Sequence, residues 1–246
     1  MSASLTAWIV AHAGTAALAF ARGAGLAWTA PGLSTPGLGV RFRILLALLL
    51  GVMLAPVVPE GVGLPWTAYL GEALVGAALG WSAALVVAGA RQAGELVGAQ
   101  GGFSAAALFD PEVTEEMTAM GHLYGLVAVA VFVALDGPLT LVRALVESYR
   151  VIPPGGLVLT EDMAGLVFGR VGQALSLSLR AAAPAALALA LAGVAMGLLG
   201  RAAPSLQLVA LAMPVRAGLG LVLVLVGLTA LTATFAEAWT LWPGGF

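Results

Sequence analysis

Few side chains in this sequence could support catalysis, and they do not form a familiar constellation. The two histidines, His12 and His122, each stand alone in an apolar run, with no HExxH pattern or carboxylate at helical spacing to build a metal site. Ser104 lies in the sequence GFSAA, which lacks the second glycine of a nucleophile elbow. Cysteine is absent, which removes thiolate nucleophiles and Cys-ligated metals. We therefore expect no catalytic residue, no metal site and no cofactor.

Two adjacent glutamates suggest one alternative, a membrane-embedded hydrolase. Glu115-Glu116 resembles the paired glutamates of intramembrane prenyl-protein peptidases, but Met120 stands where that motif needs an arginine. A membrane-embedded hydrolase would have to use Ser104, His122 and Glu116, and we rank it below the readings that need no enzyme activity.

Composition places most of the chain in an apolar environment. Of the 246 residues, 61% are hydrophobic and 9% are charged, too few charges to cover the surface of a soluble domain of this size. The ten cationic residues, all arginine, are outnumbered by twelve acidic ones, so no dense basic patch exists to neutralise a nucleic-acid backbone. We expect lipid and apolar protein as surroundings, and no nucleic-acid partner.

Long uncharged runs supply the elements that must position any site. Runs at 73–90, 117–135, 181–200 and 217–236 each have 18 to 20 residues, enough for a membrane-spanning helix. The N-terminal run lacks a basic flank and is expected to be a retained helix, not a signal peptide. The distribution of arginines does not give a consistent membrane topology. The charged stretch after residue 136 predicts an amphipathic helix, with Leu141 and Leu145 opposite Arg143, Glu147 and Arg150.

We therefore predict an all-α, polytopic membrane-associated protein forming one domain over residues 1–246. Its hydrophobic helices are expected at about 5–28, 44–58, 68–109, 115–135, 139–150, 160–200 and 205–237.

The stretch that begins at residue 94 combines polar and glycine residues within an apolar run. Glu95 and Gln100 would be costly in lipid without partners, so they should face protein or a water-filled path. Gly94, Gly98 and Gly102 follow one another at four-residue spacing, which lets two helix backbones approach closely. This predicts a tight helix-helix contact.

The same stretch ends in Asp110-Pro111, followed by several acids. Proline disfavours the helical conformation at Asp110, so the helix should end there. Locally, Thr114 could cap a new helix with Glu115 and Glu116 in its first turn. That interpretation is compatible with a gate formed by the preceding residues.

These residues resemble a known family. The sequence GELVGAQ at 94–100, with Gly102, Phe103, Ala106 and LFDP at 108–111, is similar to the hallmark stretch of the FliR family of type III secretion export proteins, which includes SpaR and YscT. Further matching residues follow in the family's order: Arg22, Pro31, Arg41, Arg43 and Pro56, then Leu135-Asp136-Gly137 with Arg143, Leu145, Ser148, Tyr149, Pro153 and Gly155, then Arg201, Pro204, Leu206, Pro214, Arg216 and Gly220. The chain departs from the family at Pro138, Leu139 and Gln207.

The resemblance implies a non-enzymatic subunit of the type III export gate, at the base of a flagellum or injectisome in the bacterial inner membrane. Its implied partners are FliP-like and FliQ-like gate subunits, FlhB-like and FlhA-like export proteins, membrane lipids and unfolded protein substrates. The fold implied is the FliP/FliR type, with bent helical hairpins raised above the membrane plane. Such an arrangement would account for the inconsistent topology.

The resemblance also implies site residues. The family's pore-closing loop corresponds to Gly102, Phe103, Ala106, Leu108, Phe109, Asp110, Pro111, Glu115 and Glu116. An apolar constriction of this kind blocks water and ions by dewetting. Polar residues expected to contact neighbouring subunits or to be buried are Glu95, Gln100, Asp136, Arg143, Arg201, Gln207 and Arg216.

A second reading is a self-sufficient secondary transporter. Its site would use Glu95, Gln100 and His122 near the middle of the membrane. The two halves of the sequence show no convincing repeat, which disfavours it.

Overall fold

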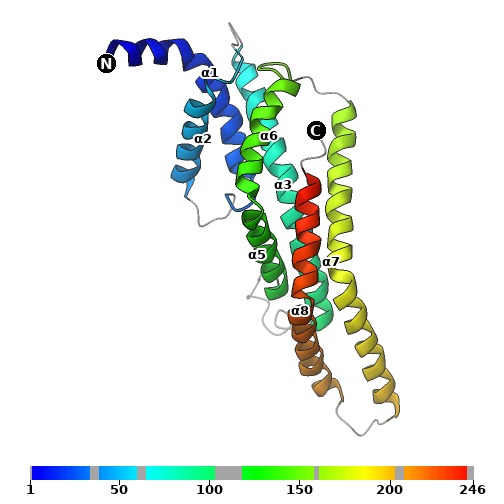
Figure 1. The fold of residues 1–246 in the computed structure, drawn as a ribbon. Helices are drawn as coiled ribbons and strands as arrows, with labels where there is room; N and C mark the ends of the chain where they lie inside the picture. Colours follow the sequence, from blue (N-terminus) through cyan, green and yellow to red (C-terminus); the bar gives the residue numbers. More distant parts are fainter. Residues whose placement is uncertain are drawn as a thin grey trace. The chain divides into compact units, whose positions relative to one another are not determined.

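The computed structural model describes residues 2–33, 39–59, 65–102, 118–157, 161–202 and 208–242 (Figure 1). Regular structure in these ranges is helical: α1 (Ser2–Thr29), α2 (Val40–Leu54), α3 (Trp66–Gly101), α5 (Ala119–Ala134), α6 (Gly137–Val151), α7 (Glu161–Ala202) and α8 (Leu208–Leu241). The predicted all-α class is confirmed.

Helix α2 begins at Val40, four residues earlier than expected, and so includes Arg41 and Arg43. Helix α5 begins at Ala119 with Thr118 as its cap. The predicted cap at Thr114 and the predicted first turn at 115–117 lie outside the described residues. The expected α3 segment 103–109 lies outside the described residues.

The chain divides into two compact units. One comprises Met1–Leu85, Asp136–Arg170 and Pro243–Phe246, and the other comprises Val86–Leu135 and Val171–Trp242. Helix α3 therefore contributes its first part to one unit and its last part to the other.

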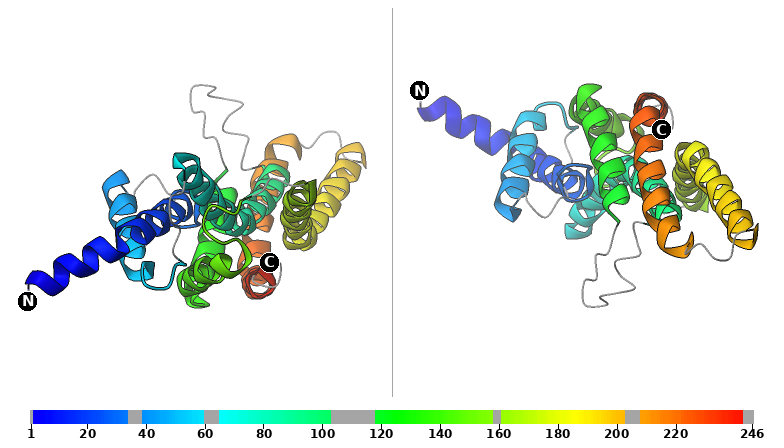
Figure 2. Two further views of the ribbon diagram at one scale, coloured as in Figure 1. Left: turned by 90° about the horizontal axis from the view of Figure 1, so that it is seen from above. Right: turned by 90° about the horizontal axis from the view of Figure 1, so that it is seen from below.

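In the first unit, glycines bring α1 close to two other helices. A Cβ placed at Gly51 of α2 would lie 3.0 Å from the Cβ of Phe20 in α1, and Figure 2 shows these two helices side by side. Between α1 and α3 the approach is closer still. A Cβ at Gly76 would collide with the backbone carbonyl of Arg22, and one at Gly25 with that of Ala73. The two backbones are thus in direct contact.

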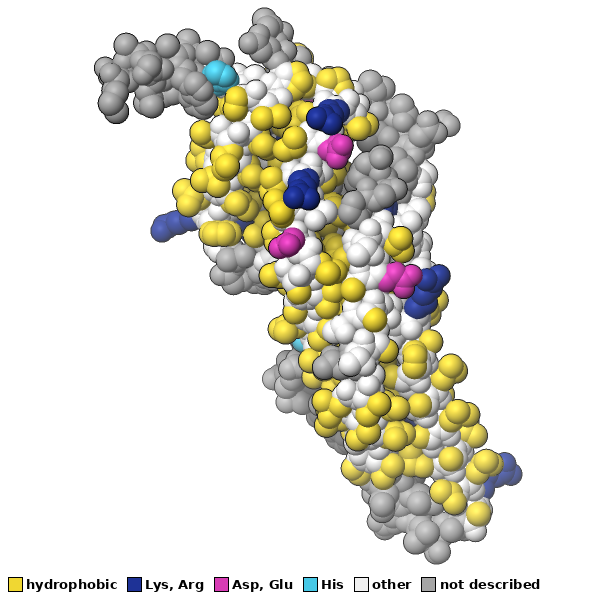
Figure 3. Space-filling view, viewed as in Figure 1, with side chains coloured by type: hydrophobic (Ala, Val, Ile, Leu, Met, Phe, Trp, Pro, Cys, Tyr) yellow, Lys and Arg dark blue, Asp and Glu magenta, His cyan; other side chains and the backbone are white. Residues whose placement is uncertain are grey.

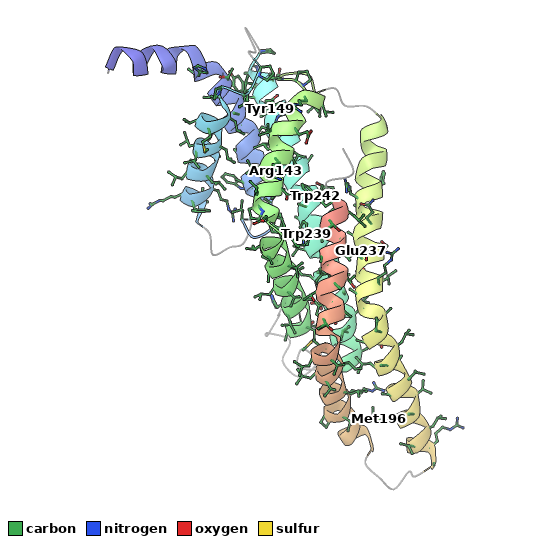
Figure 4. All side chains as sticks on the ribbon, in the orientation of Figure 1. Arg143, Tyr149, Met196, Glu237, Trp239 and Trp242 are labelled. Carbon is green, nitrogen blue, oxygen red and sulfur yellow. The ribbon has the colours of Figure 1, made fainter. Side chains whose placement is uncertain are left out.

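Helix α6 completes the first unit and is amphipathic as predicted. Leu141, Leu145 and Tyr149 are buried, while Arg143 and Arg150 are exposed. Figure 4 labels Arg143 and Tyr149 on this helix. The charged face stays free of the unit's apolar core.

In the second unit, aromatic side chains join α5 to α8. The rings of Phe132 and Trp239 have centroids 4.5 Å apart, and Tyr124 meets Phe235 edge-on at 6.5 Å. Trp239 also donates from Nε1 to the carbonyl oxygen of Ala128 at 3.3 Å. Figure 4 labels Trp239 on α8.

Much apolar surface is left uncovered (Figure 3). On α7, Leu191 is 70% exposed and Leu198 63%, and on α8 Val226 is 76% exposed. Among the described residues, Trp66–Gly101 and Phe168–Ala202 are long and apolar enough to cross a membrane. The number rises to four if α5 with α6, and the two parts of α8, each form one bent span. These faces require lipid or another apolar protein.

Candidate functional site

The candidate site lies in the second unit, where α3 ends and α5 begins. Gly102 follows the last residue of α3 with a φ of 80°. This left-handed conformation is favourable only for glycine and is a common way to end a helix. A Cβ at Gly102 would meet nothing within 4 Å, so its described environment is open and not a helix contact.

The rest of the expected pore-closing loop lies outside the described residues. This applies to Phe103, Ala106, Leu108, Phe109, Asp110, Pro111, Glu115 and Glu116, and to Ser104 of the hydrolase alternative. Their role stays a prediction.

Thr118, the residue before α5, is held against α3 by a polar contact. Thr118 donates its backbone N–H to Oε1 of Glu95 at 2.8 Å. The Thr118 hydroxyl accepts a hydrogen bond from the backbone N–H of Gly121 at 3.1 Å and so caps α5. Glu95 was predicted to contact a neighbouring subunit or to be buried, and its Oε1 accepts a hydrogen bond within this chain.

Two of the three clustered glycines lie at this contact. A Cβ at Gly94 would collide with the carbonyl oxygen of Met120, and one at Gly98 would lie 2.6 Å from the Thr118 hydroxyl. Larger residues at either position would push the start of α5 away from α3.

The remaining polar candidates are more exposed. Gln100, Asp136, Arg143 and Arg201 are exposed, and Gln207 lies outside the described residues. The guanidinium of half-buried Arg216 packs where a side chain at Gly193 would be, and its Nε has no hydrogen-bond partner in the described part of the chain. Arg216 is thus a candidate for a contact beyond this chain.

A dense polar cluster that the sequence did not predict lies in the first unit. Arg22 Nε is 2.7 Å from Oε2 of Glu72, and the two side chains are 0% and 2% exposed. Arg22 also donates to the Ser148 hydroxyl at 2.8 Å and to the Ile152 carbonyl at 3.1 Å. The second carboxylate oxygen of Glu72 accepts the backbone N–H of Gly155 at 3.1 Å. One buried ion pair therefore ties α1, α3 and the turn after α6 together.

An aromatic ring covers this cluster. The guanidinium carbon of Arg22 lies 3.8 Å from the ring centroid of Tyr149, within cation-π distance. The Tyr149 hydroxyl is buried and has no hydrogen-bond partner among the described residues. The available signal in the sequence was a lone arginine and a lone glutamate beside apolar runs, but nothing there indicated that the two residues pair.

Among the described residues, no group of three or more His, Asp or Glu side chains lies close enough together to hold a metal ion. His122 is exposed on α5, and His12 is on α1.

Together, the helices and contacts define a class: a polytopic all-α membrane protein whose helices meet through glycines and buried polar pairs. Residues 13–241 match the family model described as "Bacterial export proteins, family 1". Because the match spans most of the sequence, the chain belongs to this family, which confirms the resemblance to FliR.

Curated relatives agree with this assignment. The chain is 31% identical to the flagellar biosynthetic protein FliR of Caulobacter vibrioides over 92% of this chain and 91% of that protein. It is also 31% identical to FliR of Escherichia coli K12, over 85% of this chain and 82% of that protein. It is 30% identical to FliR of Pectobacterium carotovorum, over 82% of this chain and 79% of that protein. The chain is thus a membrane component of the flagellar, or type III, export apparatus.

Proposed function

We propose that this chain is a structural, non-enzymatic core subunit of the export gate in the bacterial inner membrane. It assembles with FliP-like and FliQ-like subunits into a closed channel for unfolded proteins, and works beside FlhB-like and FlhA-like export proteins. Family membership supports the general role of a subunit of the export apparatus. The observation that carries the assembly is Arg216, a half-buried arginine in an apolar helix whose Nε has no hydrogen-bond partner among the described residues. Such a group is stable beside apolar surroundings only with a partner.

The uncovered apolar surface supports the same proposal. Of the most apolar part of Phe168–Ala202, only 11% is buried within this chain, against 50% for Trp66–Gly101. Subunits on this face would bury the leucines that now lie open, and lipid would cover the remainder.

Closure is assigned to the segment that follows Gly102. Its residues Phe103, Leu108 and Phe109 form the apolar obstruction, and Asp110-Pro111 fix its turn. A chain pushed from the cytoplasm displaces this segment, so no catalytic step is needed. The energy comes from other components of the machine, because this chain has no lysine and therefore no Walker A motif.

Co-expression tests the assembly. A tagged copy produced with its FliP-like and FliQ-like neighbours and extracted in mild detergent should co-purify as one discrete hetero-oligomer with a single copy of this chain. Native mass spectrometry gives the mass and composition. A stable particle of this chain alone, with substrate uptake in liposomes, would replace the gate with the transporter. That alternative is already weakened, because Thr118 of the same chain engages Glu95.

Leakage tests the closure. In the assembled complex, the triple variant Phe103→Ser, Leu108→Ser, Phe109→Ser should raise resting ion conductance severalfold, because a polar constriction no longer dewets. Ala105→Ser, in the same segment but outside the predicted set of pore-closing residues, is the matched control and should stay tight. Planar-bilayer conductance of complexes of unchanged mass is the measurement. A triple variant as tight as the wild type would remove the segment from the closure.

A further inference from the structure

Helix α2 is buried on one side only. That side packs on α1 and consists of Ala47, Leu50, Gly51 and Leu54. The opposite side, which we call the outer face of α2, is apolar and exposed, and Figure 3 shows hydrophobic side chains gathered over this helix. The outer face consists of Leu45, Leu48, Leu49, Val52 and Met53, each at least half exposed. An apolar face of this kind needs a cover.

The charges near this face gather at the first turn of α2. Residues 44–59 carry none, whereas Arg41 and Arg43 lie in that turn. The Nε of Arg43 donates to the carbonyl oxygen of Leu33 at 2.9 Å, and its guanidinium carbon is 5.9 Å from the ring centroid of Trp28, which is 46% exposed. Arg41 is exposed and has no hydrogen bond or ion pair among the described residues. A guanidinium and an indole thus stand open at one end of the outer face.

The outer face has the height of one lipid leaflet. Residues 44–54 rise about 16 Å along the helix, and half of a hydrocarbon core of ~30 Å is about 15 Å. Arginine is favourable at the boundary of the hydrocarbon because its stem stays among the acyl chains while its guanidinium reaches the phosphates. Tryptophan is enriched at the same level. A protein interface would have a polar rim on every side, whereas this face is polar at one end alone.

We propose that the outer face of α2 lies against the acyl chains of one leaflet, and that Arg41 binds the phosphate of an anionic phospholipid. Arg43 and Trp28 keep the first turn of α2 at the level of the headgroups, which leaves the guanidinium of Arg41 to the lipid. The inference rests on the proposed place of this chain in the inner membrane, and it names the lipid that the first unit takes. It does not depend on how the channel is closed.

Because the chain has no cysteine, the acyl-chain contact can be tested with single spin labels. Leu45→Cys and Leu49→Cys are labelled in the complex with its partner subunits, which is then reconstituted into vesicles of phosphatidylcholine and phosphatidylglycerol. We expect frequent collisions of both labels with molecular oxygen and rare collisions with a water-soluble nickel chelate. Arg150→Cys, at an exposed position of α6, is the matched control and should show the reverse. The complex with the cysteine-free chain gives the background.

Native mass spectrometry of the same complex tests the headgroup contact. When phosphatidylglycerol is added to the detergent, Arg41→Gln should bind it about fivefold more weakly than the wild type, as expected for the loss of one arginine near an anionic membrane surface. Arg150→Gln removes another exposed arginine of the first unit and should bind phosphatidylglycerol as the wild type does. Phosphatidylcholine, which carries no net charge, should distinguish Arg41→Gln from the wild type less.

Three results would overturn the inference. If the labels at Leu45 and Leu49 collide mainly with the nickel chelate, water covers the outer face. If they collide rarely with either reagent, another subunit covers it, as in a hairpin raised above the bilayer. If Arg41→Gln binds phosphatidylglycerol as tightly as the wild type, the headgroup contact is absent. The same mass spectra show whether FliP-like and FliQ-like subunits are bound, so a failure of the proposed assembly is recognised separately.

Discussion

Arg22→Met is expected to cause the largest loss of stability in the first unit. It removes one member of a fully buried ion pair, so Glu72 keeps its charge with only the N–H of Gly155 as a partner. Leaving one buried charge unpaired costs about 3–5 kcal/mol, a large part of a typical total stability of ~5–15 kcal/mol. The expected result is a sharp fall in the amount of folded chain in the purified complex and in its unfolding temperature.

The matched control is the double variant Arg22→Met, Glu72→Met. It removes both charges while keeping side chains of similar length, and buried pairs replaced by apolar residues often lose little stability. The double variant should therefore recover much of the loss. Thermal unfolding of the complexes in detergent measures both. If Arg22→Met unfolds at the same temperature as the wild type, or if the double variant unfolds at a lower temperature than Arg22→Met, the role of the pair is contradicted.

Gly76→Ala is the second change with a large expected effect. The added methyl group would collide with the backbone of Arg22 in α1, and a backbone cannot yield as a flexible side chain can. Overpacking of this kind costs about 1–3 kcal/mol, which outweighs the ~1 kcal/mol by which alanine favours a helix over glycine. We expect lower yield and a lower unfolding temperature.

Gly14→Ala, in α1, is the matched control with the opposite sign. A Cβ at Gly14 would meet nothing within 4 Å, so only the helix-propensity gain remains, up to about 1 kcal/mol. The two alanine variants can be compared by yield and thermal unfolding in the same complex. Equal effects at Gly76 and Gly14 would show that the close approach of α1 and α3 is wrong.

Hydrophobic patterning predicted the helices well because membrane helices depend on long apolar runs. The run 73–90 lies within α3, and the run 181–200 within α7. The burial of Leu141 and Leu145 followed from their spacing relative to the charges of α6. These features depend on local sequence alone.

Glycine spacing was a poorer guide. Gly76 and Gly80 have the same four-residue spacing as Gly165 and Gly169, yet the first two touch α1 and the last two face open space. Which glycines meet another backbone depends on tertiary packing, which a spacing pattern does not contain. The high glycine content predicts only that some helix backbones can approach one another closely, not which ones do.

The sequence also did not predict which polar residues pair over long distances along the chain. Glu72 pairs with a residue 50 positions away, and Glu95 completes a cap 23 positions away. The local pattern favours a cap at Thr114, which lies outside the described residues, because acids follow it directly. The acid that serves α5 lies on another helix, which no local rule could indicate.

The polar cluster of the first unit has a consequence for the order of synthesis. Its members are separated by up to 130 residues, since Arg22 reaches Ile152. The ribosome makes residues 86–135, which belong to the second unit, between residues 1–85 and 136–170 of the first unit. Arg22 and Glu72 can meet early, but their remaining partners are made only with α6 and the turn that follows it. Until then the first unit lacks part of its buried polar cluster, while residues 86–135 of the second unit are being made.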